Sequence, residues 1–352
     1  MRAAVWYGSK DVRVEGYPTR DLARQEVRVK VKACGICGSD LHEYAAGPIM
    51  VPTSPDPLTG RMAPIVLGHE FSGEIVEVGR DVIGWKVGDR VVADPAIACW
   101  KCYACKRFNY NQCEMLGCTG LTDDGAFAEY VVVRAYQLYS LPEDVDYLAG
   151  ALVEPLAVGV HAVKRGKLSQ GERVLIVGAG PIGLAVLQAA RIAGAHSVFV
   201  AEPTPVRNEV AKMLGATAVV DFDDPATFEF LKASTKGVGF DIVFECVGSE
   251  TALRHALTLT RRGGRVVVVG VYEKDVKVDC NNFSLLEKDV VGCRAYAGDF
   301  ETVIRFLQDG RMVTKPLITK VVRLDDIVKE GFEELVHHKD RHIKILVVPG
   351  ES

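Results

Sequence analysis

The sequence lacks the features that mark a partner of nucleic acids or of membranes. Lysine and arginine together number 42 against 46 aspartate and glutamate, which gives a net charge of −4 and an isoelectric point near 6.1. Nucleic-acid-binding proteins usually carry a basic stripe and a high isoelectric point. The most apolar stretch, residues 174–187, is interrupted by three glycines and a proline and is too short to cross a bilayer. No internal repeat, low-complexity tract or charge block is present. A small molecule is therefore the expected partner, with no nucleic acid and no membrane involved.

The N-terminus also lacks the apolar run and small-residue cleavage site of a secretory signal peptide. This predicts a cytoplasmic protein. In a reducing compartment, the ten cysteines are better interpreted as metal ligands or small buried residues than as disulfides.

The 352 residues exceed the length at which a single core usually stops growing, so two domains are expected. The first ~150 residues hold short β-branched runs separated by Gly and Pro, which predicts an antiparallel β domain. From about Glu154, apolar strands alternate with amphipathic helices, a pattern typical of a parallel sheet covered by helices. After about Gly292 a final helix and strand follow. The predicted fold class is α/β.

A strand at residues 173–177 runs directly into a glycine turn and a helix. Gly178 suits a tight turn, Gly180 lets a pyrophosphate approach the backbone, and Gly183 permits close packing of helix on strand. The N–H groups at the start of the helix, including those near Pro181 and Ile182, favour bound phosphate. The turn predicts a dinucleotide site, and an ordinary glycine turn is the alternative. Val247, after a later strand, is a further expected cofactor contact.

The strand at 197–201 ends at Glu202, the spacing expected of a carboxylate that binds the adenosine ribose. A carboxylate there repels a 2′-phosphate, so NAD is predicted as the cofactor rather than NADP. Arg207 is a counter-signal, because a guanidinium can pair with that phosphate. The alternative for Arg207 is a place near the adenine or on a solvated helix face.

Two sets of residues have the chemistry of metal ligands. Cys99, Cys102, Cys105 and Cys113 lie in one short loop and can close a tetrahedral all-thiolate shell, typical of a structural zinc. The second set is dispersed along the chain: Cys37, His69, Glu70 and Glu154. A thiolate, an imidazole and one or two carboxylates can hold zinc with a position open for substrate. Spacing alone does not show that these residues meet.

The motifs GHEFSGEIVEVG at residues 68–79 and VGDRV at 87–91 resemble the zinc signature of the medium-chain dehydrogenases/reductases. The four-cysteine loop, the pair Glu154–Pro155 and the glycine turn follow in the same order, so the resemblance covers the whole chain. It implies one catalytic and one structural zinc per chain, the first held by Cys37, His69 and Glu154. It also implies that Glu70 exchanges with Glu154 or with water. Relatives often have Gly where this chain has Trp100 and Phe108, so the loop shape is in question.

The resemblance implies a GroES-like β domain at 1–153 and 291–352 and a Rossmann NAD-binding domain at 154–290. Zinc then polarises an alcohol and hydride passes to the nicotinamide. Ser39 and His42 are candidates for carrying the hydroxyl proton to solvent; a turn serine and a surface histidine are the alternatives. A tetramer or dimer is also implied.

Within the family, CGSDLHEY at residues 37–44 and the proline-rich segment 47–68 resemble the polyol and butanediol dehydrogenase branch. Sorbitol dehydrogenases have an Arg-Tyr pair where this chain has Ala295–Tyr296, and Arg294 stands one place early. A small vicinal diol or hydroxyketone, such as 2,3-butanediol or acetoin, is therefore the expected substrate. A sorbitol-type polyol dehydrogenase, an L-threonine 3-dehydrogenase and a catalytically silent zinc-stabilised binding protein are the alternatives.

Overall fold

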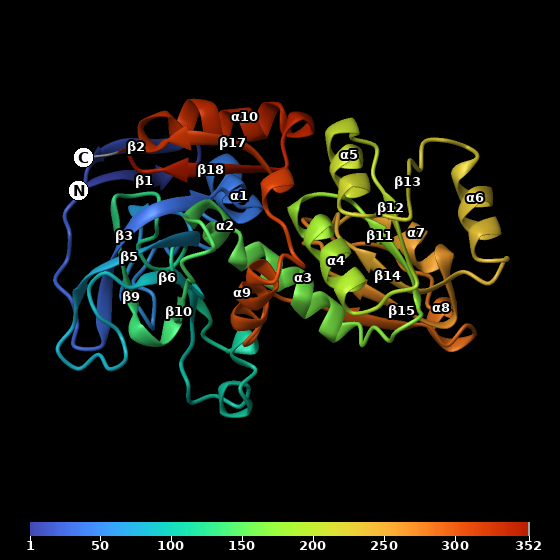
Figure 1. Cartoon of the computed structure of the whole chain (residues 1–352), viewed down its shortest axis with the longest axis horizontal. Helices are drawn as coiled ribbons and strands as arrows, with labels where there is room; N and C mark the ends of the chain where they lie inside the picture. Colours follow the sequence, from blue (N-terminus) through green and yellow to red (C-terminus); the bar gives the residue numbers. More distant parts are fainter. Residues whose placement is uncertain (351–352) are drawn as a thin grey trace. The chain divides into compact units, whose positions relative to one another are not determined.

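The computed structural model describes residues 1–350, and the chain divides into two compact units (Figure 1). Unit 1 comprises Met1–Glu154 together with the chain from Phe300 onward, and unit 2 is Pro155–Asp299. The predicted division after residue 153 lies next to this boundary. The predicted division before residue 291 cuts the strand Asp289–Gly292, which pairs with the preceding strand of unit 2. The sheet of unit 2 therefore extends past that point.

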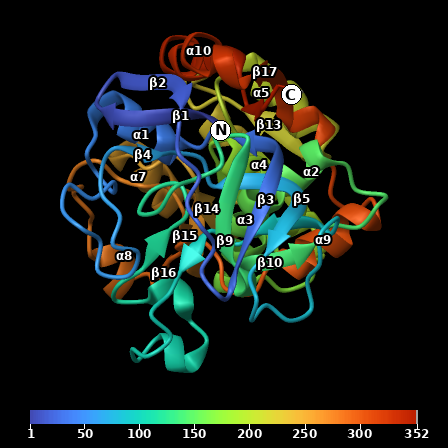
Figure 2. The ribbon, with the colours of Figure 1, turned by 90° about the vertical axis from the view of Figure 1, so that its left-hand side faces the viewer.

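Unit 1 is built on antiparallel sheets, as the β-branched runs predict. Its strands are β1 (Arg2–Gly8), β2 (Asp11–Gly16), β3 (Glu26–Gly35), β4 (Ile65–Val66), β5 (Glu70–Val78), β6 (Arg90–Ala93), β7 (Ala96–Ile97), β8 (Gly117–Cys118), β9 (Tyr130–Arg134), β10 (Leu138–Ser140), β17 (Ile318–Arg323) and β18 (Lys344–Val348). The largest sheet has the order β10-β6-β5-β3-β18-β17, and β9 also pairs with β3. The last two strands of the chain, β17 and β18, thus extend this sheet beyond β3, whereas β1 and β2 form a separate sheet with β4. Figure 2 shows β3, β5, β9 and β10 of the larger sheet together.

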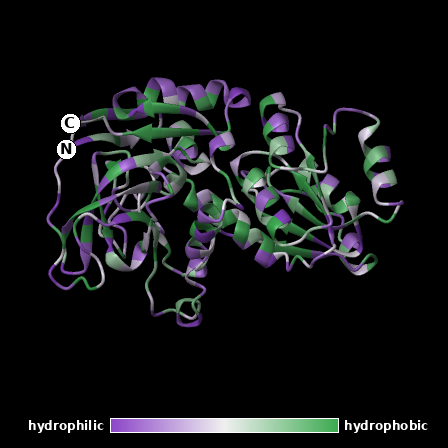
Figure 3. Cartoon of the chain, in the orientation of Figure 1, coloured by the Kyte–Doolittle hydropathy of each residue, from purple (hydrophilic) through white to green (hydrophobic). Residues whose placement is uncertain are grey.

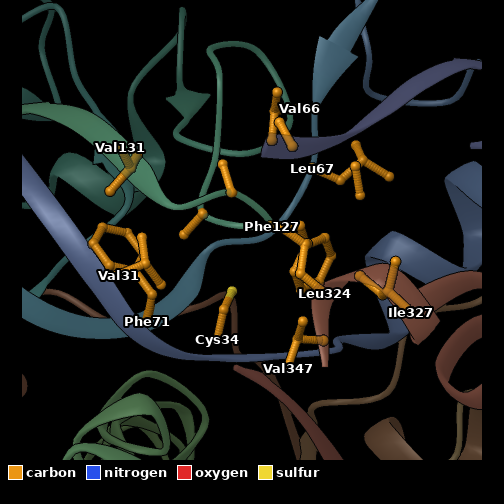
Figure 4. Packing of buried hydrophobic residues seen from close by; sticks show 14 of the residues in the cluster. Val31, Cys34, Val66, Leu67, Phe71, Phe127, Val131, Leu324, Ile327 and Val347 are labelled. Atoms are coloured by element: carbon orange, nitrogen blue, oxygen red, sulfur yellow. The ribbon is translucent and has the colours of Figure 1, made fainter. Parts of the chain in front are cut away.

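The core of unit 1 forms because alternate residues of β3 point to one face of the sheet. Val27, Val29 and Val31 are buried there, in one hydrophobic cluster with Phe127 and Val347. Figure 4 shows Val31, Phe127 and Val347 of this cluster. Each such side chain contributes about 1.5–3 kcal/mol when removed from water. Residues from both ends of the chain therefore share one core.

Short helices complete unit 1. They are α1 (Gly38–Ala46), α2 (Tyr147–Ala151), α9 (Phe300–Gln308), α10 (Glu333–His337) and the 3-10 turns Cys105–Arg107, Tyr110–Gln112, Ala135–Gln137, Lys315–Leu317, Leu324–Asp326 and Lys339–Arg341, with a π-helical turn at Ile327–Phe332. Cys37 is the N-cap of α1, and its N–H donates to the Asp40 carboxylate at 2.9 Å. This reciprocal capping fixes where α1 starts.

Unit 2 is a parallel sheet with the strand order β13-β12-β11-β14-β15-β16. The strands are β11 (Arg173–Val177), β12 (Ser197–Ala201), β13 (Ala218–Val220), β14 (Phe240–Glu245), β15 (Thr260–Val268) and β16 (Asp289–Gly292). The helices are α3 (Val153–Arg165), α4 (Pro181–Ile192), α5 (Pro205–Met213), α6 (Thr227–Ser234), α7 (Glu250–Leu259) and α8 (Asn281–Ser284). This order is that of the Rossmann fold, whose ligands bind where the strand order reverses, here between β11 and β14.

The strands of unit 2 are near-continuous apolar runs, because helices cover both faces of a parallel sheet. The hydropathy colouring shows these green strands, with purple polar residues on the helices around them (Figure 3). Over residues 1–350, no helix combines the length and the hydropathy that a membrane crossing requires. The predicted α/β class with a β-rich first domain is confirmed.

Candidate metal centres and dinucleotide site

Three of the four dispersed candidates meet in unit 1. The ligand atoms of Cys37, His69 and Glu70 all lie within 4.8 Å of one another. Cys37 is placed by the start of α1, whereas His69 and Glu70 stand at the start of β5. The Ser39 hydroxyl lies 3.2 Å from His69 Nε2. A thiolate, an imidazole and a carboxylate converging in this way are donors that suit zinc.

Asp40 completes the surroundings of His69. Its Oδ1 lies 3.5 Å from His69 Nδ1, both side chains are buried, and neither atom makes a hydrogen bond within residues 1–350. Burial lowers the pKa of His69, but the charges of Asp40 and Cys37 outweigh burial and raise that pKa well above its usual value. A pocket that favours positive charge on a buried imidazole also suits a cation at Nε2, with the carboxylate orienting the ring from behind. Sequence reasoning gave Asp40 no role, although it sits in the same motif as Ser39 and His42.

Glu70 has a second partner that the sequence reasoning missed. Lys344, on β18, donates from Nζ to both Glu70 carboxylate oxygens at 2.7 and 2.8 Å, and to the Ile36 carbonyl at 3.0 Å. Both charged side chains are buried. Gly35 makes room for the pair, since a Cβ there would lie 2.1 Å from Glu70 Oε2. The available signal was a lysine inside the apolar terminal strand.

Glu154 lies outside the cluster formed by Cys37, His69 and Glu70. It stands at the start of α3, and its charge is among the influences that raise the pKa values of Cys118 and Lys344. The pKa of Cys118 rises to about 12, mainly through burial, which agrees with its interpretation as a small buried residue. His42 is exposed on α1.

The four-cysteine loop converges as its spacing suggests. The ligand atoms of Cys99, Cys102, Cys105 and Cys113 lie within 4.8 Å of one another. Main-chain N–H groups of Cys105 and Glu114 lower the pKa of Cys102 to about 6, whereas burial raises the pKa of Cys105 to about 12. The main-chain N–H groups of Cys99 and Met115 approach the Cys113 sulfur at 3.3 and 3.4 Å. Four thiols with N–H groups aimed at them suit a closed tetrahedral zinc.

The loop carries two aromatic residues where glycine was expected. Trp100 and Phe108 have φ values of 55° and 60°, the left-handed region that glycine adopts without strain. The backbone therefore has the conformation typical of glycine at both positions, although both residues are aromatic. The four cysteine sulfurs still converge.

The glycine turn between β11 and α4 has the geometry of a phosphate-binding turn. Gly178 has φ 94°, and a Cβ at Gly183 would lie 1.9 Å from the Gly178 carbonyl oxygen. A Cβ at Gly180 would meet nothing within 4 Å, so the space above the turn is open. Gly180 caps α4, and Pro181 and Ile182 form its first turn, where unpaired N–H groups attract phosphate.

Glu202 and Val247 lie beside this turn. Glu202 is buried and accepts hydrogen bonds from the N–H groups of Ala179, at 2.7 Å, and Thr204, at 3.0 Å. Arg207 Nη1 lies 3.8 Å from the same carboxylate. Val247 is placed by Glu245, which the sequence reasoning missed.

Glu245 is a buried carboxylate at the end of β14. It accepts hydrogen bonds from the N–H groups of Val247 and Gly248, both at 2.8 Å, and from the Tyr272 hydroxyl at 2.8 Å. The Glu245 carbonyl accepts two more hydrogen bonds, from the N–H groups of Val269 and Gly270. These five hydrogen bonds to one residue make the loop rigid. An acidic residue ending an otherwise apolar strand was the signal that could have revealed it.

Comparisons with known proteins agree with both units. The model of the alcohol dehydrogenase GroES-like domain matches residues 23–143, and that of the zinc-binding dehydrogenases matches residues 181–309. The chain is 41% identical to (R,R)-butanediol dehydrogenase of Bacillus subtilis, over 99% of this chain and 100% of that one. It is 35% identical to sorbitol dehydrogenase of the same organism, over 99% and 98% of the two chains.

Solved structures are also similar over nearly the whole chain. The 2R,3R-butanediol dehydrogenase from Bacillus subtilis matches with a TM-score of 0.93 and 40% identity, covering 99% of each chain. A short chain alcohol dehydrogenase from Escherichia coli CFT073 complexed with NADH matches with a TM-score of 0.90 and 28% identity, covering 99% of each. A putative zinc-binding dehydrogenase from Sinorhizobium meliloti bound to NADP matches with a TM-score of 0.88 and 30% identity, again covering 99% of each.

Proposed function

Because the chain belongs to the zinc-dependent alcohol dehydrogenases of the medium-chain family, we propose that it interconverts a small vicinal diol and its hydroxyketone with NAD(H). The main structural support for zinc-dependent alcohol oxidation is the convergence of Cys37, His69 and Glu70 beside the Ser39 hydroxyl. The substrate class rests on the full-length similarity to butanediol dehydrogenases.

The residues of unit 1 would have separate roles in this reaction. Cys37, His69 and one carboxylate, Glu154 or Glu70, would hold the zinc, and a bound zinc would supply the Lewis acidity that lowers the pKa of an alcohol. Asp40 keeps the His69 ring oriented. Ser39 receives the hydroxyl proton, and His42, which is exposed, passes it to solvent.

The residues of unit 2 would hold the cofactor that accepts the hydride. The α4 N-terminus at Gly180, Pro181 and Ile182 binds the pyrophosphate, and Glu202 binds the adenosine ribose. In the balanced reaction, one alcohol and one NAD⁺ give one ketone, one NADH and one proton.

The residues after β16 also support a small diol rather than a longer polyol as the substrate. Polyol chains need several hydrogen-bond donors along their length, and each buried hydroxyl left unpaired costs about 1–3 kcal/mol. Arg294 is exposed, Ala295 has φ 47°, and Tyr296 is buried. In this chain Ala295 therefore separates Arg294 from Tyr296, which differs from an Arg-Tyr pair in adjacent positions. A four-carbon diol avoids most of the free-energy cost of unpaired hydroxyl groups.

An NAD(H)-linked assay over 2,3-butanediol, acetoin, sorbitol and threonine tests the proposal. We expect kcat/KM for 2,3-butanediol or acetoin to exceed that for sorbitol by at least about tenfold, equivalent to ~1.4 kcal/mol of transition-state binding. Equal or better turnover of sorbitol would favour a polyol dehydrogenase, and preference for threonine would favour a threonine 3-dehydrogenase. If the protein turns over no secondary alcohol, the alternative of a catalytically silent zinc-stabilised binding protein would be favoured.

We also propose a homo-oligomer, supported by β16. This strand is the edge of the unit 2 sheet and has β15 as its one neighbour within the described residues. Val290 on the strand and Leu285 just before it are exposed. An exposed apolar edge strand can pair with the same strand of a second copy of the chain. A dimer with a two-fold axis would provide this pairing. Light scattering on the purified protein measures the assembly, and a monomer would contradict the proposal.

A further inference from the structure

Tyr272 completes a hydrogen-bonded network around the buried carboxylate of Glu245. Its hydroxyl donates to Glu245 Oε2 at 2.8 Å, whereas Oε1 accepts the N–H groups of Val247 and Gly248. Across residues 1–350 no lysine, arginine or histidine pairs with this carboxylate. A buried carboxylate without a cation is costly, and hydrogen bonds to its charged form offset that cost only while the three donors stay in place. Glu245 and its donors therefore hold one another.

These donors belong to two loops that follow neighbouring strands of unit 2. Gly248 lies after β14, whereas Tyr272 lies after β15. The two loops also touch directly. A Cβ at Gly248 would lie 2.2 Å from the Val271 carbonyl oxygen, and a Cβ at Gly270 would lie 2.2 Å from the Gly248 nitrogen. The Glu245 side chain thus joins the second loop to the first at the carboxyl end of the sheet.

The loop after β15 is long and has few anchors. Residues 269–280 contain no helix or strand, and connections of this length are usually functional or mobile. The Tyr272 ring packs against the hydrophobic core of unit 2. Burial, together with the neighbouring Glu245 carboxylate, raises the pKa of Tyr272. The hydroxyl therefore keeps its proton at neutral pH and remains a hydrogen-bond donor.

Both loops lie beside the glycine turn of the dinucleotide site. A Cβ at Gly178 would lie 2.7 Å from Val247 Cγ2, and the Cys246 N–H donates to the Val177 carbonyl at 2.9 Å. Val247 is 52% exposed and Val271 is 75% exposed. These two apolar side chains thus stand at the edge of the sheet where a Rossmann fold binds its ligand.

We propose that Tyr272 is a positioning residue, which holds the loop after β15 against the loop after β14 through Glu245 and thereby slows the release of the bound dinucleotide. The inference rests on the cofactor site of the proposed function and extends it to the residue that orders one of its walls. With the hydrogen bond in place, Val271 is already ordered before the cofactor binds. Without it, binding must order the loop, and the complex dissociates faster.

The order of the loop can be measured without any ligand. Tyr272→Phe keeps the aromatic ring and removes the hydroxyl. Amide hydrogen exchange of Gly270 and Val271 should become at least about tenfold faster in this variant. Tyr7→Phe is the matched control, because it removes a hydrogen bond of the same kind in unit 1, from the Tyr7 hydroxyl to Glu15 at 2.7 Å. Exchange at the parent rate in Tyr272→Phe would overturn the proposal.

The effect on the cofactor is measured as the dissociation rate of NADH, followed by the fluorescence of the bound nucleotide. Tyr272→Phe should raise this rate at least about threefold, the effect of losing one hydrogen bond, with zinc content at the parent value. Tyr7→Phe should leave the rate unchanged. A merely structural role of Tyr272 would lower the melting temperature and leave the NADH dissociation rate at the parent value, and this result would overturn the inference.

A double variant tests whether Tyr272 acts through Glu245. Glu245→Gln should also speed the release of NADH, because an NH₂ group replaces one acceptor that faces hydrogen-bond donors. In the variant with both substitutions, the increase should be smaller than the product of the two single increases, since both remove the same interaction. Increases that multiply would show that Tyr272 acts independently of Glu245 and would overturn the proposed route.

The outcomes separate this inference from the proposed function. A parent protein that binds NADH but oxidises no vicinal diol contradicts the proposed substrate, while amide exchange and NADH dissociation still decide the role of Tyr272. Normal oxidation of 2,3-butanediol by the parent, with NADH released from Tyr272→Phe at the parent rate, overturns the inference alone. A parent that binds NADPH in place of NADH is measured with NADPH in the same way, and a parent that binds neither overturns both.

Discussion

Lys344 and Glu70, 274 residues apart in the sequence, form a buried ion pair with Nζ 2.7 Å from one carboxylate oxygen. Glu70 is also one of the three side chains that converge at the candidate catalytic zinc. The ammonium balances the carboxylate charge, so Glu70 is stable in the folded protein without contributing its charge to a metal. The ion pair thus joins the candidate metal centre to the last strand of the chain, and it makes Lys344 a residue to test.

Lys344→Met should lower the stability of the protein strongly. Removal of one partner of a buried ion pair leaves an uncompensated charge, at a cost of about 3–5 kcal/mol. The melting temperature should therefore fall, and the double variant Lys344→Met, Glu70→Gln should regain part of the loss because no buried charge remains. A single variant that melts at the parent temperature would contradict this assignment of the pair.

Cys37→Ser should leave a folded protein without activity. A hydroxyl is a poor zinc ligand where a thiolate is required, so bound zinc should fall from two to one per chain. Metal analysis and an activity assay on the same preparation check both quantities. Full activity with one zinc per chain would refute the assignment of Cys37.

Cys102→Ser should affect stability rather than turnover. A closed four-thiolate zinc contributes to folding, and the loss of one thiolate should lower the melting temperature while the folded fraction keeps its kcat. Cys280→Ser is the control, since Cys280 is an exposed cysteine in unit 2. Unchanged melting together with unchanged zinc content would show that the loop binds no metal.

Glu202→Ser should weaken or reverse the preference for NAD. The carboxylate repels a 2′-phosphate, and without it Arg207, whose guanidinium lies 3.8 Å away, can pair with that phosphate. The quantity to compare is kcat/KM with NAD and with NADP in parent and variant. If the parent already uses NADP better, Arg207 dominates the pocket and the predicted cofactor is wrong.

Asp299→Asn should destabilise the protein in a pH-dependent way. Burial raises the pKa of Asp299, but hydrogen bonds with His161 and Lys164 outweigh burial and leave the pKa below its usual value. The carboxylate therefore contributes stability above its unfolded pKa of about 3.9, and this contribution is lost as the pH falls below that value. The loss in the variant should be about 1.5–3 kcal/mol near pH 6 and should shrink toward pH 3.

Denaturant unfolding across this pH range measures the effect, with the exposed Asp223→Asn as the control. A difference in unfolding free energy that does not depend on pH would show that Asp299 acts through packing rather than charge.

The sequence by itself determined the features that depend on neighbouring residues. The turn at Gly178, Gly180 and Gly183 was predictable because strand, turn and helix follow one another within a few residues. The four-cysteine loop was predictable for the same reason. The alternation of strands and helices after residue 154 likewise predicted the parallel sheet, since each crossover is encoded within one βαβ segment.

Only the tertiary structure decided which distant side chains meet. Cys37, His69 and Glu70 converge because β3 and β5 pair and bring α1 beside the start of β5. The partner of Glu70 comes from β18, the last strand, and the sheet of unit 2 continues to Gly292, past the predicted boundary. Local patterns specify turns, caps and strands through short-range sterics and hydrogen bonds. The balance of buried charges depends on long-range packing, which the spacing of residues along the chain does not encode.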